Sequence, residues 1–195
     1  MIIIEGTDLV GKTTLCKALC EHDTLLKAGI TYSSLSRLPP GFDMLHHHRA
    51  RMACGLVQDR FHMSEVVYSL AADRVSRLSS EIYRLLDAMV TLHGGIIVIV
   101  TADEWLLRER YAANKEREMF SLDVVLRANE LFLKIAAIKH VPGQPFDFKV
   151  DMHLNCHIEM PFVGEKGIQK IVNLWCERRL AMIYAGERNV VRPLC

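Results

Sequence analysis

The chain has 195 residues, of which half are hydrophobic and 24% are charged, and its formal net charge is +1. This length and composition are typical of one globular domain with a large core, so we expect a single domain over residues 1–195. The near-neutral charge argues against a broad nucleic-acid footprint, and no stable nucleic-acid partner is expected. No apolar run approaches the roughly 18 residues that span a bilayer, so no membrane partner is expected either.

The six cysteines include no C-x-x-C pair. Cys16 and Cys20 are spaced to share one helix face, which favours core positions over a disulfide. This usage favours a reducing, cytoplasmic setting.

The N-terminal stretch predicts a strand, a glycine-rich turn and a helix in direct succession. Residues 1–5 form an apolar run suited to a buried parallel strand, and residues 12–22 have a helical apolar stripe. Between them, residues 6–13 match the phosphate-binding pattern G-x-x-x-x-G-K-[ST]. In this context a chance match is the weak alternative.

Each residue type in this motif has a physical role in holding phosphates. Gly6 and Gly11 allow the backbone to approach without a clashing Cβ. Backbone N–H groups from Gly11 to Thr14 and the helix dipole favour an anion there. Lys12 is expected at the β/γ-phosphates of ATP, and the Thr13 hydroxyl at Mg²⁺.

Strands and helices alternate along the rest of the chain. The patterns predict strands at 31–37, 55–59, 96–101 and 148–154, and helices at 43–53, 61–73, 76–92, 103–112, 121–138 and 164–184. With residues 1–5 this gives an α/β fold with a parallel five-stranded sheet covered by helices on both faces. Ligands of such sheets bind at the carboxyl ends of the strands.

A second constellation, Asp59-Arg60, follows the third predicted strand. A carboxylate there can reach the metal shell beside Thr13, and a guanidinium fork matches two oxygens of a transferring phosphoryl group. The alternative is a surface pair in which Asp59 caps the next helix. After the glycine-rich motif, and at a strand end, the functional interpretation is favoured.

The segments EGTDxxGKTT and DRFxxSxxxY resemble the thymidylate kinases, P-loop enzymes that transfer the γ-phosphoryl group of ATP to dTMP. The resemblance implies a three-layer P-loop kinase fold, ATP as co-substrate, and Mg²⁺ held at Thr13 and Asp59. Small-molecule nucleotides are then the expected partners, and a homodimer is compatible with the resemblance.

The resemblance also implies an acceptor site. Asp8 falls on the loop carboxylate beside the acceptor's 3′-hydroxyl, while Ser64 and Tyr68 flank its deoxyribose and base. Arg37, in SRLPPG, falls where the family grips the acceptor phosphate, and Arg60 reaches the phosphoryl group. Taken alone, Arg37 is equally a surface arginine before a turn.

The segment LHHHRARM carries the predicted base contacts. His47 and Arg51 have the spacing of the family's aromatic and arginine, but the expected phenylalanine is missing. The base therefore stays open between dTMP, dUMP and a modified pyrimidine. Three consecutive histidines point about 100° apart on a helix and do not converge on one metal ion.

Residues 105–120 are predicted to form a lid. The stretch contains Arg108, Arg110 and Arg117, while Leu9 and Val10 leave the glycine-rich loop without an extra cation. By resemblance, Arg117 is the first candidate for a catalytic lid arginine and Arg108 the second. The alternative is a solvated helix with i,i+4 ion pairs.

Together these patterns predict transfer of the ATP γ-phosphoryl group to a deoxynucleoside monophosphate. One alternative is a deoxynucleoside kinase, or a P-loop kinase acting on a hydroxyl of a modified base. It is disfavoured because such chemistry needs a carboxylate after the second strand, where the chain has Arg37 and no acid before Asp43. A second alternative, a non-catalytic nucleotide-binding module, conflicts with the intact Lys12 and Thr13.

Overall fold

Five parallel strands form the centre of the structure, a computed structural model that describes residues 1–34, 43–52, 55–117, 119–139, 146–156 and 164–189. The strands are β1 (Ile2–Glu5), β2 (Thr31–Ser34), β3 (Leu56–Asp59), β4 (Ile96–Ala102) and β5 (Met152–Cys156). They lie side by side in the order β2-β3-β1-β4-β5, and every neighbouring pair is parallel. The predicted five-stranded parallel sheet is confirmed.

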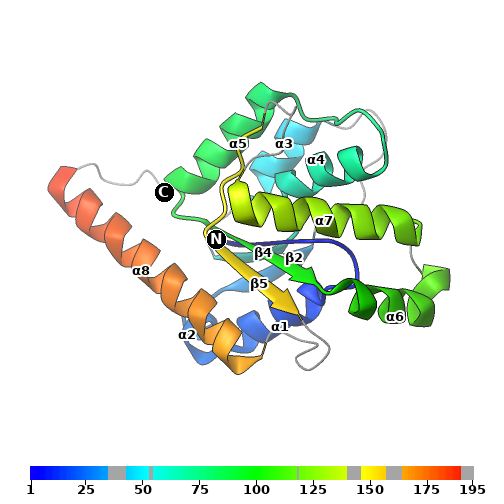
Figure 1. Ribbon diagram of the computed structural model, residues 1–195. Helices are drawn as coiled ribbons and strands as arrows, with labels where there is room; N and C mark the ends of the chain where they lie inside the picture. The colour runs from blue at the N-terminus through cyan, green and yellow to red at the C-terminus, as the bar shows by residue number, and fades with distance from the viewer. Residues whose placement is uncertain (35–42, 53–54, 118, 140–145, 157–163, 190–195) are drawn as a thin grey trace.

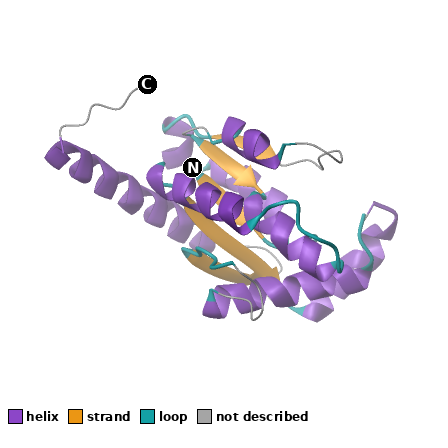
Figure 2. Ribbon diagram, turned by 90° about the horizontal axis from the view of Figure 1, so that it is seen from above, coloured by secondary structure: helices purple, strands orange, loops and turns teal. Residues whose placement is uncertain are grey.

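Helices cover both faces of the sheet (Figures 1 and 2). They are α1 (Lys12–Glu21), α2 (Asp23–Lys27), α3 (Met44–Ala50), α4 (His62–Ala71), α5 (Ser80–Leu92), α6 (Glu104–Asn114), α7 (Leu122–Ile138) and α8 (Glu165–Asn189), with a 3-10 turn η1 (Lys115–Arg117). In Figure 1, α3, α4, α5 and α7 lie above the strands, and α1, α2 and α8 below. This is the predicted three-layer α/β arrangement.

The side chains of β1 point alternately to the two faces of the sheet, and each face has its own hydrophobic core. Ile2 and Ile4 pack with α1 and α8, on what we call the α8 face of the sheet. Met1 and Ile3 pack with α4, α5 and α7, on what we call the α7 face. Side chains alternate along a strand, so Glu5 also belongs to the α7 face, just before the glycine-rich loop begins.

Several predicted boundaries differ from the observed ones. The last strand was expected at 148–154 but runs over Met152–Cys156, because its pairing begins where Asp151 N donates to the Ile97 carbonyl at 2.9 Å. Helix α5 begins at Ser80 instead of residue 76, since the Ser79 side chain accepts from Ile82 N as its cap. Helix α8 continues to Asn189, and the short α2 was not predicted.

Two further predicted elements lie partly outside the described residues. Strand β2 is described to Ser34, and the rest of the predicted 31–37 strand falls in the gap at 35–42. Helix α3 ends at Ala50, where Arg51 forms the C-cap, and not at residue 53. Among the described helices, none has both the length and the hydrophobicity needed to cross a membrane.

Candidate functional site

The glycine-rich loop joins β1 to α1 at the carboxyl edge of the sheet. Gly6 has a φ of 145°, and a Cβ placed on it would lie 2.1 Å from the Val100 carbonyl oxygen. Only glycine therefore lets the chain pass this close to β4. Gly11 has a φ of 90° and forms the left-handed N-cap of α1, so the helix begins at Lys12 as predicted.

Lys12 is 5% exposed, and its ammonium donates to the Thr7 carbonyl at 2.5 Å inside the loop. Its charge is thus held at the N-terminus of α1, where the helix dipole also favours an anion. Thr14 follows on the exposed first turn of the same helix. The arrangement can bind phosphate oxygens through backbone N–H groups and one ammonium.

Thr13 and Asp59 meet between α1 and the end of β3. The Thr13 hydroxyl donates to Asp59 Oδ2 at 2.6 Å, and the Tyr32 hydroxyl approaches the same oxygen at 3.4 Å. A hydroxyl and a carboxylate oxygen side by side are hard ligands of the kind that Mg²⁺ prefers, so this pair fits the ion. The helix-capping alternative for Asp59 is not observed, because α4 has Phe61 as its N-cap.

Arg60 and Asp8 form an ion pair beside this oxygen pair. The Arg60 guanidinium lies 5.2 Å from the centre of the Tyr68 ring, and Arg60 adopts a φ of 66° with its N–H bonded to the Ile4 carbonyl. The Tyr68 hydroxyl accepts from Asp8 N and donates to Asp8 Oδ2, both at 2.7 Å. The structure therefore brings together three residues that were predicted to contact the acceptor.

Glu5 is a buried residue of this site that the sequence patterns did not single out. Its carboxylate accepts from Phe61 N at 3.0 Å and from the Ser64 hydroxyl. Burial raises the pKa of Glu5, although these hydrogen bonds and the charges of His62 and Lys12 oppose the rise. Ser64, predicted to face the acceptor, thus donates a hydrogen bond to Glu5, and the two together fix α4 to the end of β1.

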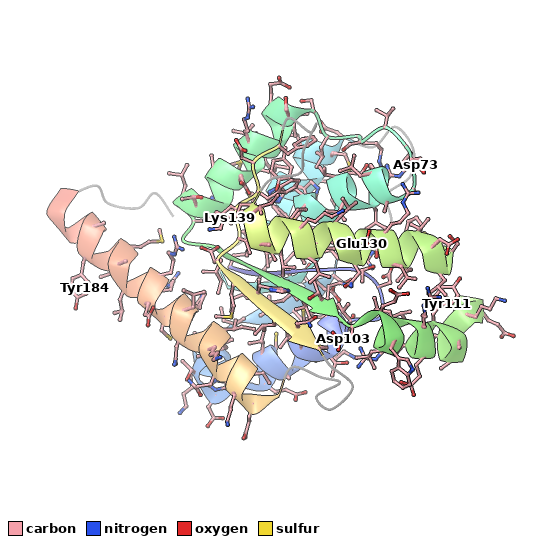
Figure 3. All side chains as sticks on the ribbon, in the orientation of Figure 1. Asp73, Asp103, Tyr111, Glu130, Lys139 and Tyr184 are labelled. Atoms are coloured by element: carbon pink, nitrogen blue, oxygen red, sulfur yellow. The ribbon has the colours of Figure 1, made fainter. Side chains whose placement is uncertain are left out.

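The predicted lid corresponds to α6 and η1, at the right of Figure 3, where Asp103 and Tyr111 are labelled. Arg108 lies on the exposed side of α6 and pairs with Glu104 at 2.6 Å, the i,i+4 arrangement of the alternative interpretation. The side chain of Arg117 lies outside the described part of the structure. Neither observation places a predicted lid arginine against the glycine-rich loop.

A different arginine does contact that loop. Arg110 Nη1 donates to the Leu9 carbonyl at 2.5 Å, from the side of α6 that also buries Leu106 and Leu107. These three residues are spaced so that they share one side of a helix. The spacing could therefore have predicted from the sequence that Arg110 faces inward.

The end of the predicted lid contacts Tyr68, one of the predicted acceptor residues. The ring of Phe120 stacks on Tyr68 with 4.8 Å between centroids, and the Phe120 carbonyl accepts from the Tyr111 hydroxyl at 3.1 Å. The segment after η1 is thereby held over the ring that also faces Arg60.

The predicted base-binding helix is α3, and the structure describes most of the residues that were predicted there. Its three histidines differ in exposure: His46 is exposed, His47 is half-buried and His48 is buried, as expected for side chains that diverge. Arg51 donates to the Ser34 carbonyl at 2.6 Å, so it reaches the end of β2. Arg37 lies outside the described residues. No group of three or more histidines, cysteines or acids that could hold a metal is found among the described residues.

Asn129, from the middle of α7, is another residue that sequence reasoning missed. Its side chain accepts from Ala102 N at 3.2 Å and donates to Ala102 O at 2.8 Å. Strand β1 pairs with β4 only as far as Ile99, so Asn129 takes the place of a neighbouring strand for Ala102. This fixes the end of β4 immediately before α6.

Comparison with known proteins identifies the fold. No protein-family model matches the chain, and no curated protein was found to match its sequence. Among solved structures, the YorR protein of Bacillus subtilis in complex with phosphorylated GDP is similar, with a TM-score of 0.60 and 16% identity over 96% of this chain and 97% of that one. Polyphosphate kinase 2 of Arthrobacter aurescens has a TM-score of 0.54 and 13% identity, with 91% of this chain and 66% of that one covered. At these identities the likeness concerns the fold alone, a parallel five-stranded sheet covered by helices on both faces.

Proposed function

We propose that this protein transfers the γ-phosphoryl group of ATP to a deoxynucleoside monophosphate, with dTMP or a related pyrimidine nucleotide as the first candidate. The observation that carries the proposal is the position of Lys12, Thr13 and Asp59 directly beside the linked residues Asp8, Arg60 and Tyr68. One set suits the donor phosphates, and the other suits a nucleotide acceptor.

In the proposed reaction an oxygen of the acceptor phosphate attacks the γ-phosphorus of ATP. A bond forms between that oxygen and phosphorus, the bond to the β-phosphate bridging oxygen breaks, and ADP and the diphosphate leave. Because the acceptor is already an anion, no strong general base is needed, and positioning and charge provide the catalysis.

Each side chain then has a defined task. Lys12 places positive charge at the β/γ-phosphates, and Arg60 leaves Asp8 to hold the phosphoryl group being transferred. Thr13 and Asp59 would hold Mg²⁺, which supplies charge neutralisation at the phosphates when it is bound. Asp8 and Tyr68 position the acceptor sugar. A lid arginine, with Arg117 as the first candidate and Arg108 as the second, places positive charge at the phosphoryl group being transferred.

What is known of the two similar structures from their names is consistent with phosphoryl transfer. One is a polyphosphate kinase, and the other was solved with a phosphorylated guanine nucleotide. The missing phenylalanine on α3 leaves the base open, so dUMP and modified pyrimidine nucleotides belong in the first test. Arg37, His47 and Arg51 complete the proposed acceptor site, and Ser64 supports it through its hydrogen bond to Glu5.

The direct test is a turnover screen with Mg·ATP against dTMP, dUMP, the other deoxynucleoside monophosphates and thymidine. We expect a monophosphate to be the preferred acceptor, and Lys12→Ala to lower turnover by about 10²–10³, the usual effect of losing one group that stabilises transition-state charge. Lys17→Ala, on the exposed side of the same helix, is the matched control and should keep wild-type turnover.

Two results would contradict the proposal. Preference for thymidine over every monophosphate would favour a deoxynucleoside kinase. Turnover of Lys12→Ala within about threefold of wild type would remove the assigned role of the glycine-rich loop, since a lost transition-state charge contact has a far larger effect.

A further inference from the structure

The tip of the glycine-rich loop has an unusual backbone. Leu9 has a φ of 68°, in the left-handed region that favours glycine and that non-glycine residues adopt at a conformational cost. Leu9 is half-buried, and the neighbouring Val10 is 1% exposed. A strained residue of this kind persists only where its surroundings hold it.

Arg110 supplies such a contact. Its Nη1 donates at 2.5 Å to the carbonyl of Leu9, the same residue whose backbone is left-handed. The contact joins α6 to the loop across 101 residues of sequence, and Arg110 is half-buried there. A hydrogen bond from a charged donor is among the stronger ones, so it can stabilise a backbone that Leu9 would otherwise leave.

The helix that carries Arg110 is fixed in place by core packing. Leu106 and Leu107, on the same side of α6, are 4% and 0% exposed, so the helix cannot roll away without exposing core residues. On the β5 side, the Cys156 thiol lies 3.7 Å from the Val10 carbonyl and packs against the next residue of the loop. Two consecutive carbonyls of the loop are thus contacted from outside it, by α6 and by β5.

We propose that Arg110 is a positioning residue that holds the glycine-rich loop in its phosphate-binding conformation through the Leu9 carbonyl, and so links the lid helix to the donor site. The inference rests on the proposed function in that ATP is taken to bind at this loop. It differs from the expected role of a lid arginine, because Arg110 acts on the loop backbone and not on the transferring phosphoryl group.

A double-mutant cycle on Leu9 and Arg110 tests this link. Glycine adopts a left-handed φ freely, so Leu9→Gly relieves the strain that the Arg110 contact compensates. Equilibrium binding of Mg·ATP is measured without any acceptor, for wild type, Leu9→Gly, Arg110→Ala and the double variant, with thermal unfolding of each. Arg110→Lys, which can still donate to a carbonyl, and Arg84→Ala, an exposed arginine on α5, serve as controls.

We expect Arg110→Ala to weaken Mg·ATP binding by about tenfold to a hundredfold, the range for a hydrogen bond to a charged group. Leu9→Gly alone should change it by less than about threefold, and in the Arg110→Ala background it should recover about fivefold or more, because the two sites are coupled. Arg110→Lys should retain most of the affinity, and Arg84→Ala all of it.

Additive effects of the two substitutions would overturn the proposal, since they would mean that Arg110 does not act through Leu9. An unchanged affinity of Arg110→Ala would overturn it as well. If the wild type binds Mg·ATP but phosphorylates no monophosphate, the proposed function fails while the cycle still decides the role of Arg110. If the wild type does not bind Mg·ATP, both proposals fail.

Discussion

The two faces of the sheet are built from different kinds of residue. On the α8 face, Ile2, Ile4 and Val57 pack mainly with aliphatic side chains of α1 and α8, together with Cys16 and Trp175. On the α7 face, aromatic side chains such as Phe61 and Tyr83 are packed together with buried polar groups. Those polar residues include Glu5, His48, Gln58, His62, Ser64, Glu65, Ser69, Thr101 and Asn129.

The proposed function accounts for this difference. In that proposal the glycine-rich loop binds phosphates mainly through backbone N–H groups, so the core beneath it needs few buried polar groups besides Lys12 and Asp59. The proposed nucleotide acceptor is contacted by side chains, and these need buried polar partners to fix their positions. Glu5 is an example, because its carboxylate holds the Ser64 hydroxyl and the backbone that carries Arg60 and Phe61.

The largest effect is expected when a polar group is introduced on the apolar face. Val57 is 0% exposed on the α8 face, so Val57→Asn should lower the free energy of unfolding by about 3–5 kcal/mol, because the amide oxygen and nitrogen would be unpaired and methyl burial would be lost. Its neighbour Gln58, on the α7 face, has both amide atoms buried without a partner. Gln58→Met should therefore be neutral or stabilising.

Urea unfolding of both variants would check this contrast. Thr31→Asn, exposed at the start of β2, is the control and should stay within about 0.5 kcal/mol. Equal destabilisation by Val57→Asn and Gln58→Met would show that the two faces respond alike, against the proposed difference.

The next largest effect concerns Asn129. Asn129→Leu leaves both backbone groups of Ala102 unpaired in a buried position, which should lower the free energy of unfolding by about 2–4 kcal/mol. Asn173→Leu, on the exposed side of α8, should change it by less than about 0.5 kcal/mol. Chemical denaturation decides, and a loss under about 1 kcal/mol for Asn129→Leu would mean that Ala102 finds other partners.

The positions predicted best from the sequence are those set by the local backbone. Gly6, Gly11, Lys12 and Thr13 lie within eight consecutive residues, and they occupy the predicted turn between a strand and a helix and the start of that helix. Asp59 was also predictable, because the carboxyl ends of parallel strands meet at one edge. The strand order puts β3 beside β1, and with it Asp59 beside Thr13.

The contacts that were missed join residues far apart in sequence. Leu9 and Arg110 are separated by 101 positions, and Ala102 and Asn129 by 27. Helical spacing indicates that Arg110 faces inward, yet it does not say which carbonyl it will meet. The prediction named Arg117 first and Arg108 second on motif position, and only the packing of α6 shows that Arg110 contacts the loop while Arg108 pairs with Glu104.

A pH-dependent effect is expected at His48 on the α7 face. Burial, with the nearby His62 and His47, lowers the pKa of His48 from 6.5 to about 3, so the folded protein keeps this ring neutral. The unfolded chain binds a proton below about pH 6.5, and stability is therefore lost as the pH falls from 7 towards 3. Between pH 7 and pH 5 this amounts to about 2 kcal/mol from His48 alone.

His48→Leu should remove that part of the acid sensitivity. The variant is expected to lose about 2 kcal/mol less than wild type between pH 7 and pH 5, as measured by denaturant unfolding at both values. His46→Leu, on the exposed side of the same helix, should leave the pH dependence unchanged. Parallel curves for wild type and His48→Leu would mean that folding does not lower the pKa of His48.

The smallest effect is expected on the exposed side of α6. This side is in contact with solvent, whereas the opposite side buries Leu106 and Leu107. Glu104 and Arg108 form an i,i+4 pair whose side chains are 65% and 52% exposed. Solvent screens such pairs, so a double-mutant cycle with Glu104→Ala and Arg108→Ala should give a coupling energy of only about 0.3–0.5 kcal/mol, falling further in 1 M salt. A coupling above about 1 kcal/mol would show that this pair is shielded from solvent. If Arg108→Ala also lowered turnover while leaving stability unchanged, the arginine would have a second position over the phosphates, and the lid would then use both sides of α6.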